Sequence, residues 1–435
     1  MSISFWEFFI HPVLRAPMWG CILMCLASSL IGVPIFLKKR SLLSESLSHA
    51  AYPGVIIGVS LFALLFPSGE EWVSIAVLIG AFISSLLGLK AIEWLEQKGK
   101  ARSDAALSFV LSVFFGLGIV AASAMQSTLP VWHKQTQMLL FGQAATMSDL
   151  HIAIYGAMAL LVSAFLFLTF RPLQASLFDR NYSISANLPV ALLEKILFWL
   201  LLISLIVGIR SVGVVLMSGM VIAPVVAARQ FSEKLQTVFI LSGFFGALSG
   251  LLGNYISVIG SISLSLTLPT GPMIVLAASS IAVLSLLFAP KRGLVFRMLR
   301  VYAFRLRCLE ENLLKAIWKK ETAAFSDLKK DHQVSSMALK YALYRMKKEG
   351  WLIDQNKSFS LTDDGLQKGA SLVRLHRLWE LYLAEKLGVQ GEHIHNTAEE
   401  MEHILTPEIE ARLTDLLSDP TTDPHSQPIP KRRAR

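Results

Sequence analysis

Apolar segments long enough to cross a lipid bilayer are the feature that most constrains how this chain can fold. A membrane-spanning helix needs about 20 mostly apolar residues, and several segments within residues 1–290 approach or exceed that length. Only helices and closed barrels satisfy every backbone hydrogen bond in lipid, so we predict an all-α polytopic membrane domain over 1–290. Apolar length and flanking charge predict about nine transmembrane helices, at 16–37, 52–67, 72–95, 105–126, 150–170, 192–209, 211–228, 236–258 and 270–289.

The distribution of charge divides the chain into two parts. Residues 1–290 contain only 15 of the 40 Lys and Arg residues and 11 of the 31 Asp and Glu residues. The rest of the chain, 291–435, is therefore expected to be water-soluble. Its first segment, 291–307, carries six Lys and Arg residues and no acid, which is typical of a basic linker that touches anionic lipid. A nucleic-acid-binding arm is the alternative.

The same charges predict which side of the membrane each loop faces. Lys and Arg are enriched in cytoplasmic loops. One set of loops carries twelve of these residues, and the opposite set carries only Arg15, Lys134 and Arg210. We therefore predict a multi-pass protein of the inner (cytoplasmic) membrane, with the soluble part, which begins at Lys291, in the cytoplasm.

Two ionisable residues of the membrane domain are candidates for a cation pathway. Glu45 and His49 are four residues apart in SLLSESLSHAAYPG, so a helix would present both on one face. Ionisable groups at membrane depth are costly and commonly functional, and a carboxylate with an imidazole suits Mn²⁺, Fe²⁺ or Zn²⁺. The alternative is that both side chains are solvated near the cytoplasmic membrane edge.

The segment 212–235 is a candidate for docking onto a motor subunit. We expect a helix break at Ala223–Pro224, followed by a short amphipathic turn at the cytoplasmic face. The candidate coupling residues are Pro224, Arg229 and Glu233. An ordinary proline kink between spans is the alternative. Because the chain contains no Walker A sequence, GxxxxGK[ST], any ATP that drives transport must bind to another chain.

The first half of the soluble part, 308–370, has the pattern of a small α+β winged helix-turn-helix domain. Two short helical segments are followed by a hairpin-like segment, GWLIDQNKSFSLTDDG. The second helix is predicted to bury a stripe of Met337, Leu339, Ala342, Leu343 and Met346. This helix is where DNA contacts are expected, and the candidate residues are Ser335, Ser336, Lys340, Tyr341 and Arg345. Winged helices also bind proteins, which leaves a docking role open.

The second half, 371–430, contains the strongest cluster of candidate metal ligands and is predicted to be helical. His376 and Glu380 are one helical turn apart, and His393 and His395 follow them. Another helical segment then places Glu399, Glu402 and His403 on one face. Mixed carboxylate and imidazole ligands without cysteine favour Fe²⁺ or Mn²⁺, with Zn²⁺ possible. A solvated charged face is the alternative for each cluster.

Four blocks of the membrane domain together resemble the permeases of manganese/zinc/iron ABC importers, the ABC-3 family. These blocks are SLLSESLSHAAYPGVIIG, LLFGQAATMSDL, SVGVVLMSGMVIAPVVAAR and SLTLPTGPMIVL. The resemblance implies that Glu45 and His49 lie on the metal pathway, although the family usually has aspartate where this chain has Glu45. It also implies a separate ATPase subunit, an extracytoplasmic metal-binding protein and a second permease subunit, the same or homologous.

The soluble part resembles the metal-dependent repressors of the diphtheria-toxin-repressor family. RMKKEGWLI, HRLWELYLAEKLGV, AEEMEHILTPEIEARL and DPTTDPHSQPIP are similar to blocks of that family and occur in its order. The resemblance implies one metal site at Glu399, Glu402 and His403 and a neighbouring site at His376, Glu380 and His395. It also implies homodimerisation through 371–430 and binding to operator DNA.

Two positions depart from the repressor pattern. Asn312 and Lys315 stand where the family has metal ligands on its first helix. The first site is therefore expected to be weaker, or to be completed by Glu311 or by water.

These observations predict a fused protein that is not an enzyme itself: the permease subunit of an ATP-driven metal importer joined to a metal-dependent repressor. Imported metal would serve as substrate and as co-repressor. The alternative is a permease whose tail is an autoinhibitory metal sensor that never binds DNA. A further hypothesis is that proteolysis within 291–320 releases a soluble repressor.

Overall fold

The structure is a computed structural model that describes residues 4–65, 73–214, 216–265, 267–355, 358–389, 401, 403 and 406–431. Its contacts separate the chain into two compact units, Met1–Phe296 and Arg297–Arg435. The boundary falls six residues after the predicted end of the membrane domain. Each unit is described by itself.

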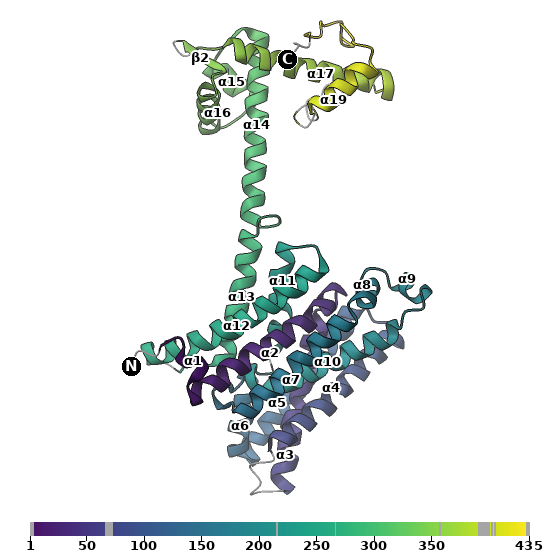
Figure 1. Cartoon of the computed structure of the whole chain (residues 1–435), viewed down its shortest axis with the longest axis vertical. Helices are drawn as coiled ribbons and strands as arrows, with labels where there is room; N and C mark the ends of the chain where they lie inside the picture. The colour runs from purple at the N-terminus through teal and green to yellow at the C-terminus, as the bar shows by residue number, and fades with distance from the viewer. Residues whose placement is uncertain are drawn as a thin grey trace. The chain divides into compact units, whose positions relative to one another are not determined.

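The first unit is built from helices (Figure 1), as the apolar runs predict. Its long helices are α2 (Pro12–Leu37), α3 (Leu42–Leu65), α4 (Val73–Gln97), α5 (Ser103–Thr128), α7 (Asp149–Leu168), α10 (Val190–Val212), α12 (Leu235–Leu264) and α13 (Thr270–Phe288). Its shorter helices are α1 (Glu7–Ile10), α6 (Pro130–Phe141), η2 (Ala144–Thr146), α8 (Phe170–Phe178), α9 (Arg180–Ser185) and α11 (Met217–Phe231).

The structure revises the predicted number of spans. Among the described residues, eight helices are long and apolar enough to cross a membrane. The segment predicted as a span at 211–228 instead forms α11, whose 15 residues extend about 22 Å, against about 30 Å of hydrocarbon.

The predicted helix break at Ala223–Pro224 is wrong. Pro224 is buried inside α11, because one missing backbone N–H can be tolerated where neighbouring helices pack closely. The chain breaks earlier, between α10 and α11, at Gly213, whose φ is 98°. A Cβ atom at this glycine would lie 2.3 Å from the carbonyl oxygen of Leu140. The break is therefore set by a close backbone approach between distant segments.

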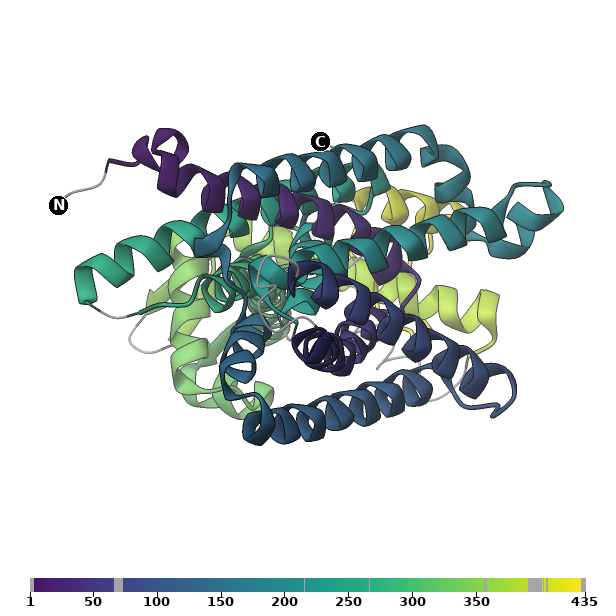
Figure 2. The same cartoon turned by 90° about the horizontal axis from the view of Figure 1, so that it is seen from below.

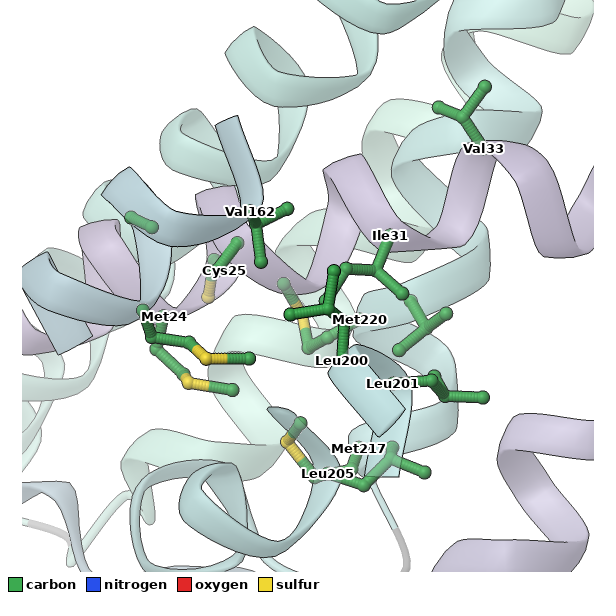
Figure 3. Packing of buried hydrophobic residues seen from close by; sticks show 14 of the residues in the cluster. Met24, Cys25, Ile31, Val33, Val162, Leu200, Leu201, Leu205, Met217 and Met220 are labelled. Carbon is green, nitrogen blue, oxygen red and sulfur yellow. The ribbon is translucent and has the colours of Figure 1, made fainter. Parts of the chain in front are cut away.

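Helix α2 lies at the centre of the first unit. It packs against α7, α10, α11 and α12, as can be followed in Figures 1 and 2. The main apolar core gathers there, with Met24, Ile31, Val162, Leu201 and Met217 converging from these helices (Figure 3). Cys21 and Cys25 are fully buried in this core, where they pack as small apolar side chains.

Helices α3 and α4 cross at a pair of glycines. A Cβ atom at Gly54 would lie 2.0 Å from the carbonyl oxygen of Gly80, and one at Gly80 would lie 2.1 Å from that of Gly54. Small residues allow helix backbones to approach closely in membranes. This crossing fixes the position of α3, which carries both candidate pathway residues.

Replacing Gly54 by Val is therefore expected to force α3 away from α4 and to reduce metal uptake by about tenfold or more. The measurement is initial uptake per mole of inserted protein. Gly116→Val is the matched control on α5, because no atom lies within 4 Å of a Cβ placed there. Equal uptake by the two variants would show that the crossing does not matter for transport.

The second unit contains the predicted winged helix-turn-helix. It is formed by α14 (Leu294–Lys320), which begins in the first unit, α15 (Phe325–His332), α16 (Ser336–Lys348) and the strands β1 (Thr322–Ala324), β2 (Leu352–Gln355) and β3 (Ser358–Leu361). The strands form an antiparallel sheet in the order β1-β3-β2. Leu313, Ile317, Leu328, Leu339 and Met346 form the core beneath it.

Two helices run across the predicted domain boundaries. The predicted linker 291–307 contains the first half of α14, which continues without interruption to Lys320. Helix α17 (Asp363–Leu387) crosses the predicted boundary at 370, and α19 (Pro407–Leu416) packs against it. The segments that were predicted to bind DNA and metal are therefore joined by a continuous helix rather than by a flexible linker.

Candidate metal pathway, metal-sensing site and DNA interface

The candidate pathway residues lie inside a helix. Helix α3 begins at Leu42, ten residues before the predicted start of this span at 52, so both Glu45 and His49 belong to it. His49 is 8% exposed and Glu45 is partly buried. The structure thus places the pair within the helical bundle, as the pathway interpretation requires.

A series of serine hydroxyls ties α3 to its neighbours. Ser46 donates to the carbonyl oxygen of Leu107 at 2.9 Å, and Ser48 donates to that of Val214. From α4, Ser84 donates to the carbonyl oxygen of Ala50 at 2.6 Å. These bonds satisfy buried hydroxyls and fix the rotation of α3, and with it the direction of the His49 side chain.

The imidazole of His49 retains an available coordination atom. Its ring lies edge-on to Phe115, with 4.7 Å between ring centroids. Its buried Nδ1 atom has no hydrogen-bond partner among the described residues. Since buried polar atoms are normally paired, this nitrogen suits a passing cation.

A second buried histidine was not identified from the sequence. His133 on α6 is 9% exposed, and its Nδ1 atom also has no hydrogen-bond partner within the described part of the chain. Helix α6 contacts α3, α5 and α10. The available sequence signal was a histidine directly after the apolar residues Val131 and Trp132.

The candidate coupling residues lie where α11 meets α12. Arg229 in the last turn of α11 donates to the carbonyl oxygens of Ser232 and Glu233, at 3.4 and 3.2 Å. The Glu233 carboxylate lies 2.5 Å from the guanidinium of Arg292, which lowers the pKa of Glu233. Pro224 is buried one helical turn or more from this loop, so the structure brings Arg229 and Glu233 together but not Pro224.

Helix α16 presents most of the predicted DNA-contact residues. Ser335 caps the helix by accepting a hydrogen bond from the backbone N–H of Ala338 at 3.2 Å. Ser336 is partly buried at the first turn, and Lys340 and Tyr341 are exposed. A basic and aromatic surface therefore extends along one side of the helix.

One residue of the predicted buried stripe faces the other way. Met337 is 83% exposed, whereas Leu339 and Met346 are fully buried. At about 100° per residue, Met337 lies across the helix from Leu339. The prediction that Met337 is a core residue is wrong. Met337 shares the exposed surface of α16 with Tyr344, which is 63% exposed and was not among the predicted DNA-contact residues.

Arg345 has a partner inside the domain. Its guanidinium lies 3.3 Å from the carboxylate of Glu310 on α14, which is 3% exposed. Burial raises the pKa of Glu310, and the charge of Arg345 opposes this shift. The pair joins α16 to α14 and orients the recognition surface.

The candidate metal-sensing residues come together in two described pairs. His376 Nε2 lies 3.1 Å from Glu380 Oε1 on α17, and His403 Nδ1 lies 2.6 Å from Glu311 Oε2 on α14. The predicted ligands His395, Glu399 and Glu402 lie outside the described residues. Among the residues that are described, no three His, Cys, Asp or Glu side chains form a metal cluster.

The two departures from the repressor pattern lie beside one of these pairs. Asn312 and Lys315 line a cavity of about 230 Å³ together with His376. Lys315 is 9% exposed. Glu311, which directly precedes Asn312 in the chain, contacts His403 instead. The structure thus brings a carboxylate of α14 to the histidine of the first predicted site.

Arg374 holds the C-terminal segment against α17. This buried guanidinium donates to Glu410 at 3.3 Å, to the carbonyl oxygen of Pro430 at 2.9 Å and to Thr414 at 3.2 Å.

Arg374→Ala is expected to destabilise the second unit by about 3 kcal/mol, because it leaves buried acceptors unpaired. Thermal unfolding of purified residues 297–435 measures this loss. Arg412→Ala is the control, and an equal loss in both variants would contradict this role.

Comparisons with known proteins cover both units. Residues 10–289 match the ABC 3 transport family, and residues 362–431 match the metal binding and dimerisation domain of iron dependent repressors. A "probable metal transport system membrane protein" of Chlamydia trachomatis is 35% identical over 94% of each chain. The manganese transport system membrane protein MntC of Bacillus subtilis is 28% identical over 89% of this chain and 88% of its own.

A solved structure shows a similar fold for the first unit. PsaBC from Streptococcus pneumoniae is similar to this chain with a TM-score of 0.56 and 24% identity, over 68% of this chain and 98% of that one. The family match extends over most of the membrane helices, including α3 and the segment around α11. The chain therefore belongs to the ABC-3 transport family and carries, in the same polypeptide, a C-terminal domain of the iron-dependent-repressor type.

Proposed function

We propose that this protein is the permease subunit of an ATP-driven importer of divalent metal ions, fused to a metal-dependent transcriptional repressor. The observation that carries the transport half is the buried His49, whose Nδ1 has no described hydrogen-bond partner, one turn from Glu45 in a membrane helix. The relatives named above include a manganese transport protein. A carboxylate and an imidazole suit Mn²⁺, Fe²⁺ and Zn²⁺ as substrates.

The proposed transport cycle uses partners that this chain does not contain. A separate ATPase binds the cytoplasmic face at Arg229 and Glu233, with Pro224 supporting α11. An extracytoplasmic metal-binding protein delivers the ion, and a second permease subunit completes the channel. The excess of Lys and Arg in one set of loops supports this orientation. Eight full spans alone would leave both termini on one side of the membrane, so a cytoplasmic C-terminal unit requires that the shorter helix α11 returns the chain to the cytoplasmic face.

The proposed sensor uses ligands from three segments. His403, Glu399 and Glu402, with Glu311 as the carboxylate from α14, hold one ion, and His376, Glu380 and His395 hold a second. A bound divalent cation supplies positive charge that links these segments. The 2.6 Å contact between Glu311 and His403 supports this assignment. Lys315 was expected to weaken the first site. Because it lines a cavity with His376, we propose instead that its positive charge repels a metal ion at the second site and weakens binding there.

The proposed DNA interface is the exposed side of α16. Ser335, Ser336, Lys340 and Tyr341 contact the operator, and Arg345 positions the helix through Glu310. Metal binding favours the homodimer that places two such helices on a two-fold operator, so metal and DNA affinities rise together. Fe²⁺ and Mn²⁺ are the favoured co-repressors, as the ligand types suggest.

One experiment separates repression from autoinhibition. Purified residues 297–435 are incubated with promoter DNA of the uptake genes and with Fe²⁺, Mn²⁺ or Zn²⁺, and gel retardation is measured. Metal-dependent retardation supports the repressor. Its absence, together with faster uptake after deletion of the second unit, would instead support an autoinhibitory tail.

Release of the repressor is a further part of the proposal. Exposed basic residues within 291–320 offer cleavage sites, and cleavage there would free the DNA-binding unit from the membrane. Immunoblots of soluble and membrane fractions, with an antibody to the C-terminal unit, test this step. Detection of only full-length, membrane-bound protein in both metal-rich and metal-poor cells would refute this release.

A further inference from the structure

The first half of α14 is an amphipathic helix whose apolar side chains are uncovered. Every residue from 296 to 305 is exposed. The large apolar side chains of this segment are between 41% and 64% exposed: Leu294, Phe296, Met298, Leu299, Val301, Tyr302 and Phe304. In contrast, Leu306, Leu313 and Leu314 are buried in the core of the second unit. The uncovered stretch therefore ends where that core begins.

Most of the apolar side chains of this segment lie on the side of the helix opposite its four arginines. At about 100° per residue, Phe296, Met298, Leu299 and Tyr302 share one side. The other side carries Arg297, Arg300, Arg305 and Arg307, with Val301 and Phe304 between them. A helix with an apolar side and an arginine-rich side is typical of segments that lie in a membrane interface.

We propose that residues 294–307 form an interfacial helix that binds the anionic phospholipid surface of the membrane in which the permease resides. Charge complementarity supports this partner, because residues 294–307 carry four arginines and no acid. Chain continuity supports it too. The last span, α13, ends at Phe288 and α14 begins at Leu294, so the helix starts at the headgroup region.

The charge pattern also argues against the main alternative, a pair of α14 helices from two copies. A parallel pair that buried the apolar sides would leave the arginines of both helices on its outer surfaces, with no acid within 291–307 to neutralise them. An anionic lipid surface neutralises the same cations and accepts the apolar side chains.

This contact makes the second unit responsive to lipid. The helix that lies on the lipid is continuous with the residues that hold Glu310 and Glu311. Binding to anionic lipid therefore shields the basic residues of 291–307 from proteases and restrains the helix that carries the contacts to α16 and His403.

The test uses the full-length protein in nanodiscs. An environment-sensitive fluorophore is attached at Met298→Cys on a Cys308→Ser background, since Cys21 and Cys25 are fully buried. Nanodiscs of phosphatidylcholine alone are compared with nanodiscs containing about 30% phosphatidylglycerol. Trypsin cleavage after Lys291, Arg292 and Arg305, the sites in 291–307 that every variant retains, is timed in the same samples.

The expected result is a blue-shifted fluorophore and cleavage slower by about fivefold or more in the anionic discs. Both effects are lost in the triple variant that combines Arg297→Gln, Arg300→Gln and Arg307→Gln, and both are lost at high salt. The matched control is a triple variant that removes three exposed cations elsewhere in the second unit, Lys329→Gln, Lys330→Gln and Lys386→Gln. It is expected to keep both effects. Tryptophan fluorescence of each variant confirms that it is folded.

Three outcomes would overturn the proposal. The first is an identical signal in the two kinds of disc. The second is a blue shift that depends on protein concentration rather than on lipid charge, which would show self-association. The third is protection that appears only when duplex DNA is added, which would identify 291–307 as a nucleic-acid arm.

Discussion

Replacing Glu45 by Gln and His49 by Ala together is expected to abolish metal uptake while the protein still inserts into the membrane. The change removes the carboxylate charge and the imidazole nitrogen that we assign to the pathway, and both lie on one face of α3. Loss of even an outer-shell partner of a metal commonly costs 10- to 100-fold, so loss of both ligands should reduce uptake by at least about 100-fold. The measurement is initial uptake of Mn²⁺, Fe²⁺ and Zn²⁺ by cells that express equal amounts of each variant.

The chain offers a matched control for this pair. Glu7 and His11 have the same spacing, and both are exposed at the N-terminal end of the described chain. Glu7→Gln with His11→Ala is expected to transport at close to the original rate. If the Glu45 and His49 variant transports as fast as this control, the pathway does not pass along α3.

The second large effect is expected at the metal-sensing site. His403→Ala or Glu311→Gln should each remove metal-activated DNA retardation by residues 297–435. Each variant deletes one side of the 2.6 Å contact between α14 and the segment that contains His403. The metal concentration needed for half-maximal retardation should rise by about 100-fold or more. Glu402→Ala should have the same effect if Glu402 is a ligand.

An exposed histidine of the same unit provides the control. His425 is exposed and belongs to neither described pair of candidate ligands, so His425→Ala should keep the metal response. Circular dichroism before metal addition establishes that each variant is folded. An unchanged metal response in both the His403 and the Glu311 variants would mean that these residues do not hold the ion.

Apolar length predicted the membrane helices because lipid imposes a local requirement that a sequence displays directly. The same holds for the winged helix-turn-helix: the spacing of Leu339, Leu343 and Met346 and the hairpin after Gly350 are local patterns, and the structure confirms them. The matches to the transport and repressor families agree with the resemblances seen in short motifs.

Local patterns failed where distant segments decide the conformation. Pro224 suggested a break, yet α11 continues through it. The chain turns instead at Gly213, which packs against the backbone of Leu140. Met337 suggested a core position by its apolar side chain alone, but the rotation of α16 is set by the residues that α14 and the sheet cover.

The helical membrane part and the soluble part rich in potential metal ligands could both be predicted from local composition, because they follow from which side chains water, lipid and metal ions accept. Which groups meet depends on the three-dimensional packing. It brought Glu311 rather than Asn312 to His403, gave Arg345 the buried partner Glu310, and left the Nδ1 of His49 without a described partner. These outcomes depend on the packing of elements far apart in the chain, and no local spacing encodes them.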